Sequence, residues 1–106
     1  MHTHTVFFWL WKTLSVEKRR QFENGLDLLS RDPNVLDRRI GRPAETNRSV
    51  VDSSYDFCLI ARFETLAAHN AYQESEAHQV FLDTCSEMWS RVQVYDVQES
   101  AVSNHR

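Results

Sequence analysis

The sequence predicts a single α+β domain in which one antiparallel β-sheet is covered by helices on one face. Its 106 residues are the length of about one domain. Segments of alternating aromatic and β-branched residues, typical of strands, are separated by segments with the spacing of amphipathic helices. Two predicted strands follow each other with no helix between them, which favours hairpins and crossovers over a parallel sheet.

The first strand is predicted from His4 to Trp11, because this run is β-branched and aromatic and contains no breaker. Strand alternation divides its side chains between two faces. One face carries His4, Val6, Phe8 and Leu10, and the other carries Thr5, Phe7, Trp9 and Trp11. Both faces are largely apolar, so we expect both to be covered.

A helix is predicted to follow, from an N-cap at Ser15 to about Ser30. Its apolar positions are spaced by four and three residues, as on the buried face of a helix. They are Phe22, Leu26 and Leu29, with Leu28 beside them. The polar segment 30–34 ends the helix.

Two strands joined by a loop form the middle of the chain. Val35 to Arg42 is mostly polar and is therefore expected at a sheet edge. Residues 43–54 are rich in Pro, Asn, Ser and Asp and predict the loop. Tyr55 to Phe63 has the clearest alternation, with an apolar face of Tyr55, Phe57, Leu59, Ala61 and Phe63.

Two short helices and a last strand complete the domain. Thr65 is the expected N-cap of a helix through Tyr72, and Ser75 that of a second helix to about Trp89. The second helix has an apolar stripe of His78, Phe81, Leu82, Cys85 and Trp89. Val92 to Val97 is the last strand. We therefore place the domain at residues 1–97 and a disordered C-terminal tail at residues 98–106.

The order strand–helix–strand–strand–helix–strand predicts a ferredoxin-like βαββαβ sandwich, whose helices cover one sheet face. The other face would carry Phe7, Trp9, Cys58, Ile60 and Tyr95. An apolar patch of this size implies an interface, so we expect a homodimer whose sheets pack face to face.

The composition argues against several classes of function. The net charge of −3 does not favour nucleic-acid binding. The two glycines exclude a Walker loop and a GxGxxG turn, the two cysteines form no CxxC pair, and no HExxH is present, so no cofactor is expected. The longest apolar run, Val6 to Trp11, is far below the roughly 20 residues that cross a bilayer. We expect a cytoplasmic protein without membrane contact, because no secretory signal is evident.

Several stretches resemble the stress-responsive α/β-barrel (Dabb) family. They are residues 4–10 (HTVFFWL), 55–64 (YDFCLIARFE), 71–72 (AY), 76–81 (EAHQVF) and 94–97 (VYDV). The family pattern His-Pro-x-His-x-x-Phe has lost its first His-Pro pair here and keeps its second histidine as His78. The resemblance spans residues 3–97 and implies a homodimer whose two sheets form one barrel.

The resemblance leaves the activity open. The leading expectation is a domain that binds a hydrophobic or aromatic small molecule in the cleft between sheet and helices. The alternative is a cofactor-independent acid–base enzyme similar to a plant polyketide cyclase of the family, with His78 as base and His4 and Tyr72 orienting an oxygen. A third alternative is a structural protein that assembles further through its surface.

The resemblance also implies an apolar wall for that cleft. The wall would consist of Val6, Phe8, Phe22, Leu26, Leu59, Ala61, Leu66, Phe81, Leu82, Trp89, Val92 and Val94. Leu26 and Leu82 replace a tyrosine and a glycine of the cyclase. These replacements remove a hydroxyl and add a side chain, so they predict a narrower cleft.

The histidines also have structural interpretations. His78 could bond a backbone carbonyl and fix the start of its helix. His2 and His4 share a strand face, but two ligands without a nearby Asp, Glu or Cys would bind a metal only adventitiously, so no metal site is expected. His69 lies on a short helix beside Asn70 and is expected in solvent.

Overall fold

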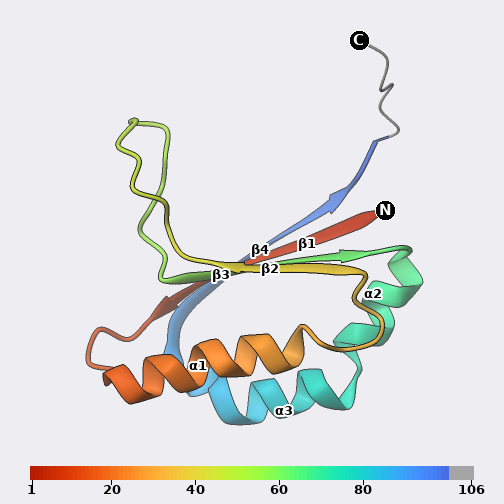
Figure 1. The fold of residues 1–106 in the computed structure, drawn as a ribbon, viewed down its shortest axis with the longest axis horizontal. Helices are drawn as coiled ribbons and strands as arrows, with labels where there is room; N and C mark the ends of the chain where they lie inside the picture. The colour runs from red at the N-terminus through yellow and green to blue at the C-terminus, as the bar shows by residue number, and fades with distance from the viewer. Residues whose placement is uncertain (101–106) are drawn as a thin grey trace.

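A computed structural model describes residues 1–100, in which strands and helices follow the predicted order (Figure 1). Four strands form one antiparallel sheet in the order β2-β3-β1-β4. Their bounds are β1 (His2–Leu10), β2 (Asp37–Gly41), β3 (Phe57–Phe63) and β4 (Trp89–Gln98). The helices are α1 (Val16–Leu29), α2 (Leu66–Gln73) and α3 (Glu76–Cys85), followed by the 3₁₀ turn η1 (Ser86–Met88). This is the predicted ferredoxin-like arrangement.

Each α-helix begins at the predicted cap. The hydroxyl of the capping residue accepts a hydrogen bond from a backbone N–H in the first turn, which satisfies one of the free donors at a helix start. The pairs are Ser15 with Lys18, Thr65 with Ala68, and Ser75 with His78.

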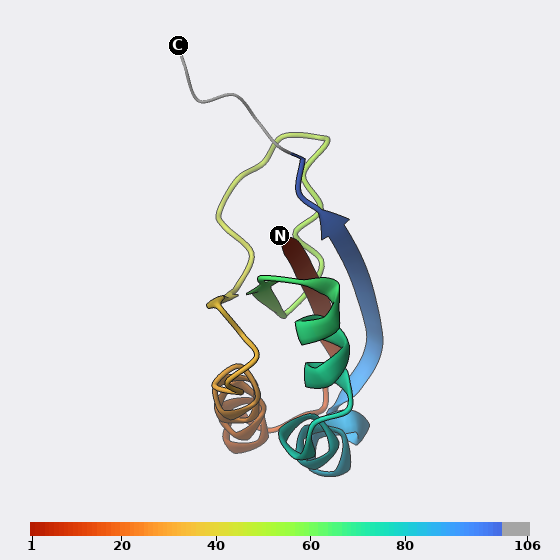
Figure 2. The ribbon, with the colours of Figure 1, turned by 90° about the vertical axis from the view of Figure 1, so that its right-hand side faces the viewer.

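The helices cover one face of the sheet. Helices α1 and α3 lie along this face, and α2 lies at the end of the sheet near the N-terminus (Figures 1 and 2). The core between them is aromatic: the Phe22 ring centroid lies 5.0 Å from that of Phe8 and 5.9 Å from that of Phe81. Phe22, Leu26 and Phe63 are fully buried. The predicted inward faces of β1 and of β3 from Phe57 to Phe63 are confirmed. Tyr55 was predicted on the same face but lies before β3 and packs against Phe7 on the opposite face.

The opposite face of the sheet carries aromatic side chains that no helix of residues 1–100 covers. The Phe7 ring lies 4.9 Å from Tyr55 and 6.1 Å from Tyr95. The Arg91 guanidinium lies over the Trp9 ring at 4.2 Å, and Tyr95 is 58% exposed. Within residues 1–100, no helix is long and apolar enough to cross a membrane.

The start of the last strand differs from the prediction. Helix α3 ends at Cys85, not at about Trp89, and Trp89 is the first residue of β4. Trp89 lies four residues after Cys85, so its spacing continued the apolar stripe of the helix. The 3₁₀ turn η1 redirects the chain, and Trp89 pairs with Leu10 of β1 instead.

The β1–β4 pair extends beyond the predicted strands at the end where His2 meets Gln98. β1 begins at His2, which pairs with Gln98, and β4 continues to Gln98. Glu99 accepts two hydrogen bonds from the Arg62 guanidinium, at 2.9 and 2.8 Å, and one from the Thr3 hydroxyl at 2.8 Å. The first two residues of the predicted tail thus belong to the fold. Residues 101–106 of that tail lie outside the described residues.

Candidate functional site

The connection between α2 and α3 places Tyr72 beside His78. Tyr72 lies in the last turn of α2 and His78 in the first turn of α3. One side chain ties both backbones together: the Ser75 hydroxyl donates to the Tyr72 carbonyl at 2.7 Å and accepts from the His78 N–H at 3.1 Å. The two rings meet edge to face, with centroids 5.5 Å apart. The sequence prediction that these two residues share a site is consistent with this geometry.

A cavity of about 170 Å³ lies between the sheet and α3, beside these rings. The three predicted polar residues all line it, namely His4, Tyr72 and His78. From the predicted apolar wall it is lined by Val6, Phe8, Leu59, Phe81, Leu82, Trp89, Val92 and Val94. Leu29 and Gln73 complete the lining, although neither was predicted to form part of the cleft wall.

Four residues of the predicted wall do not line the cavity. Phe22, Leu26 and Ala61 are fully buried in the core, where neighbouring side chains cover them. Leu66 is 59% exposed, because it occupies the solvent side of the first turn of α2. Leu82 lines the cavity as expected, yet it does not close it.

The environment of Tyr72 and His78 controls their protonation. Burial lowers the pKa of His78, and nearby His4 and His69 lower it further, so its neutral form is favoured at neutral pH. Burial, assisted by the Asp32 carboxylate, raises the pKa of Tyr72 above its ordinary range. A neutral imidazole that can accept a proton therefore lies beside a phenol that remains a donor.

The polar atoms of these two side chains have no hydrogen-bond partner among residues 1–100. In the described part of the chain, neither the Tyr72 hydroxyl nor the His78 ring forms a hydrogen bond with another residue, and hydrogen bonding contributes to neither pKa. No fully enclosed side-chain polar atom of residues 1–100 lacks a partner. Both groups must therefore keep some accessible surface, and both residues line the cavity.

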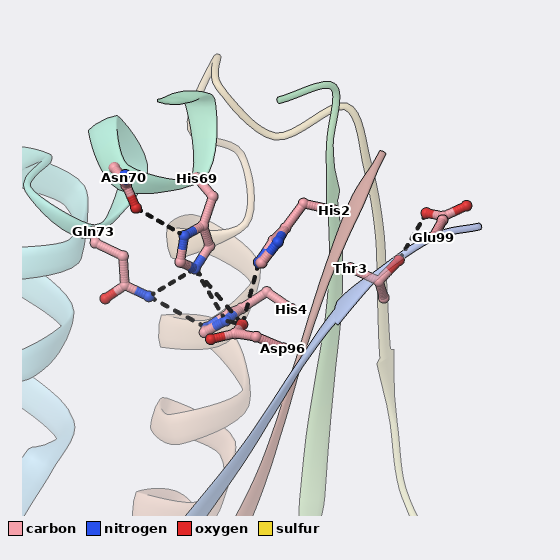
Figure 3. A network of polar contacts seen from close by, with 8 residues as sticks. All are labelled: His2, Thr3, His4, His69, Asn70, Gln73, Asp96 and Glu99. Atoms are coloured by element: carbon pink, nitrogen blue, oxygen red, sulfur yellow. Dashed lines mark hydrogen bonds and ion pairs between the residues drawn. The ribbon is translucent and has the colours of Figure 1, made fainter. Parts of the chain in front are cut away.

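A second polar group occupies the end of the sheet under α2 (Figure 3). His4 and Asp96 are paired residues on β1 and β4, and His4 Nδ1 lies 2.6 Å from Asp96 Oδ1. His2 Nε2 lies 3.3 Å from the same carboxylate oxygen. His69 Nε2 on α2 lies 3.3 Å from His4 Nδ1 and 3.7 Å from Asp96 Oδ1. Three imidazoles thus surround one carboxylate oxygen.

The expectation that His69 lies in solvent is wrong, because His69 is only 7% exposed. It lies three residues before Tyr72, so it shares the inward face of α2 with Tyr72. The reason for expecting no metal site also fails: His2 and His4 do have a carboxylate nearby, that of Asp96. No sequence spacing could reveal this, since Asp96 is more than 90 residues away along the chain.

Comparison with known proteins supports the fold and the family. No curated protein matches the sequence. A Dabb family protein from Mesorhizobium loti superposes with a TM-score of 0.76 at 20% identity, over 94% of this chain and 97% of that one. Hydroxynitrile lyase from Passiflora edulis superposes with a TM-score of 0.76 at 16% identity, over 95% and 96% of the two chains. A dimeric ferredoxin-like protein of unknown function from Thermobifida fusca gives 0.73 at 18% identity, over 91% and 88%.

These low identities establish the fold alone, whereas the family rests on a match to the sequence itself. The model of the Stress responsive A/B Barrel Domain family matches residues 3–99, which is nearly the whole described chain. That range also includes Glu99, which anchors the end of β4 to Arg62. The chain belongs to the stress-responsive A/B barrel domain (Dabb) family.

Proposed function

We propose that the cavity between the sheet and α3 binds a small hydrophobic or aromatic molecule. The observation that carries this proposal is that Tyr72 and His78, whose side-chain polar atoms have no partner among residues 1–100, both line a cavity with a largely apolar wall. A ligand site typically combines an apolar wall with a few convergent polar groups. The volume of about 170 Å³ suits one ring, since a cavity of about 150 Å³ accepts benzene.

Phenol tests this proposal, because its ring fits the apolar wall and its hydroxyl can pair with His78. We expect saturable chemical-shift changes in the ¹H–¹⁵N spectrum, concentrated on residues that line the cavity. Leu82→Trp should block binding, since Leu82 lines the cavity. Leu28→Trp is the matched control, because Leu28 is 68% exposed. Non-saturating shifts, or unchanged binding in Leu82→Trp, would contradict the proposal.

We also propose a second candidate function, acid–base catalysis at the same site. The specific support is the pairing of a neutral imidazole with a protonated phenol, held together by Ser75. His78 would remove a proton from a carbon next to a carbonyl group. The electron pair of that C–H bond would form the C=C bond of an enolate, and the π pair of the carbonyl would move onto its oxygen, which would accept a hydrogen bond from Tyr72. One structural neighbour, the Passiflora edulis hydroxynitrile lyase, is named as an enzyme of small molecules.

Proton exchange would reveal this chemistry without knowledge of the natural substrate. Acetophenone in D₂O should exchange its methyl protons for deuterium faster with the protein than without it, as followed by NMR. His78→Gln should slow the protein-dependent exchange by about 10²-fold or more. Tyr72→Phe should also slow it, because the enolate oxygen would lose its donor. Bound acetophenone that exchanges no faster than in buffer would reject the catalytic role.

We propose further that two copies of the chain associate through the open sheet face. Phe7, Trp9 and Tyr95 lie on this face, and Tyr95 is 58% exposed. Such a patch is stabilised when a second apolar surface covers it. Several proteins of the same fold are described as dimeric, including that from Thermobifida fusca. The mass of the protein in solution, compared with that of a Trp9 variant, tests this association.

A further inference from the structure

We propose that His2, His4, His69 and Asp96 form a binding site for a divalent transition-metal ion, with zinc as the best fit. Each residue offers one ligand atom, and the four atoms all lie within 4.8 Å of one another. They come from three elements, β1, α2 and β4, which meet at one end of the sheet (Figure 3). Three imidazoles and one carboxylate form a complete tetrahedral donor set for Zn²⁺.

The spacing of the ligand atoms supports a four-coordinate ion. Metal–ligand bonds of about 2.0–2.2 Å place neighbouring tetrahedral ligands roughly 3.3–3.5 Å apart. The separations are 3.3 Å from His2 to Asp96, 3.3 Å from His69 to His4, and 3.7 Å from His69 to Asp96. The hydrogen-bonded pair of His4 and Asp96 is closer, at 2.6 Å. The remaining separations, from His2 to His4 and to His69, lie within 4.8 Å. An ion that replaces the proton between His4 and Asp96 would increase the separation of this pair by less than about 1 Å.

The neighbour of His69 already suits metal binding, and that of His4 would suit it after one amide rotation. A ligating histidine usually donates its other ring N–H to an oxygen, which fixes the tautomer and the ring. His69 Nδ1 lies 3.2 Å from Asn70 Oδ1, so that it can donate there and keep the Nε2 lone pair toward the cluster. His4 Nε2 lies 3.5 Å from the Gln73 amide. The nitrogen of this amide also lies 3.3 Å from His69 Nε2. Rotation of the amide would free His69 Nε2 and turn the amide oxygen toward His4, where it would accept a hydrogen bond from the Nε2–H of His4.

The three histidine side chains of the cluster are enclosed, whereas the Asp96 side chain is open to solvent. The His4 and His69 side chains are 6% and 9% exposed, and that of His2 is 12% exposed. The Asp96 side chain is 44% exposed and forms the open side of the cluster. An ion could therefore enter past Asp96 and then lie against three buried imidazoles. Four protein ligands leave no free position, as in structural zinc sites.

This site does not depend on the proposed ligand or on catalysis. His4 also lines the cavity, so a bound ion would fix the His4 ring at the cavity wall. Because the ion would join β1, α2 and β4, its main effect would be on stability. Zinc should raise the melting temperature as its concentration increases, since it binds the folded chain in preference to the unfolded one.

The test is calorimetric titration of Zn²⁺ into chelator-treated full-length protein, produced without a polyhistidine tag. We expect one ion per chain and an increase in melting temperature. His69→Gln and Asp96→Asn should each weaken zinc binding by more than about tenfold, because each removes a ligand. Asp96→Asn preserves shape at a partly exposed position, so it keeps the test independent of folding defects.

Two controls separate the cluster from other histidines. His78→Gln alters a histidine outside the four-residue cluster. His105→Gln alters one in the segment outside the described residues. Neither should change zinc affinity. Co²⁺ should give the intense visible absorption of a four-coordinate ion, and Asp96→Asn should change it. The proposal is overturned if zinc binding is not saturable, or if the cluster variants bind zinc as the unmodified chain does.

Discussion

Gly25 of α1 lies directly against Cys85 of α3: a Cβ atom on Gly25 would stand 2.8 Å from Cys85 Sγ. The missing side chain therefore allows the two helices to approach each other. Glycine within a helix is less favourable than alanine by about 1 kcal/mol. At position 25 the close contact between the two helices matters more than this loss of helix propensity. Any other residue would bring its Cβ atom closer to the Cys85 sulfur than real Cβ atoms come.

Gly25→Ala should consequently destabilise the protein by about 1–3 kcal/mol, as expected for overpacking. Urea unfolding would measure the loss. In a Cys85→Ala background, which removes the sulfur, Gly25→Ala should become neutral or stabilising. Additive effects in this double-mutant cycle would show that the two residues do not interact.

Leu82→Ala should enlarge the cavity and change which ligands it accepts. The smaller side chain would leave room for a second ring, so 1-naphthol should bind more tightly relative to phenol. The cost in stability should stay below about 2 kcal/mol, since Leu82 is only half-buried. Leu28→Ala, at an exposed position, should alter neither property. An unchanged preference in Leu82→Ala would place the ligand elsewhere.

Trp9→Glu should convert a dimer to monomer or aggregate, because it places a charge in the proposed interface. Light scattering with size-exclusion chromatography would measure the mass. Leu66→Glu is the matched control: it adds the same charge at a residue that is 59% exposed on α2. A soluble dimer of unchanged mass in Trp9→Glu would show that another surface mediates association.

The contacts of Glu99 with Arg62 and Thr3 at the end of β4 should stop stabilising the fold in acid. Hydrogen bonds from Arg62 and then from Thr3 hold the pKa of Glu99 at about 2, against an ordinary value of 4.5. Because the pKa of Glu99 is lower in the folded chain than in the unfolded chain, its contacts stabilise the fold above about pH 4.5. This stabilisation is lost as pH falls toward 2. Glu99→Gln should therefore reduce stability near neutral pH, with a difference that shrinks in acid. Unfolding curves of both proteins at several pH values would measure this difference in stability. A difference that does not change with pH would show that the Glu99–Arg62 pair contributes nothing.

The fold was largely predictable because its signals are local. Alternation on β1 and β3, and hydroxyl caps at Ser15, Thr65 and Ser75, each depend on a few adjacent residues. The end of α3 was predicted wrongly for the same reason. Trp89 continues the helical spacing locally, whereas its actual place is determined by pairing with Leu10.

The candidate site was predictable only in part. Family resemblance indicated Tyr72 and His78, and the structure places both on the cavity. The histidine cluster gave no such signal, since His4, His69 and Asp96 are far apart in sequence. The family resemblance assigned Phe22 and Leu26 to the cavity wall, whereas the structure buries both in the core.

The Ser75 hydroxyl, which bonds both the Tyr72 carbonyl and the His78 N–H, has a mechanical consequence. Because these bonds join the backbones of Tyr72 and His78, we expect them to limit movement of α2 relative to α3 at this connection. When the cavity opens, the Tyr72 and His78 rings should then move together, while the wall on the sheet side moves away from them. Their mutual alignment would survive the entry and departure of a ligand.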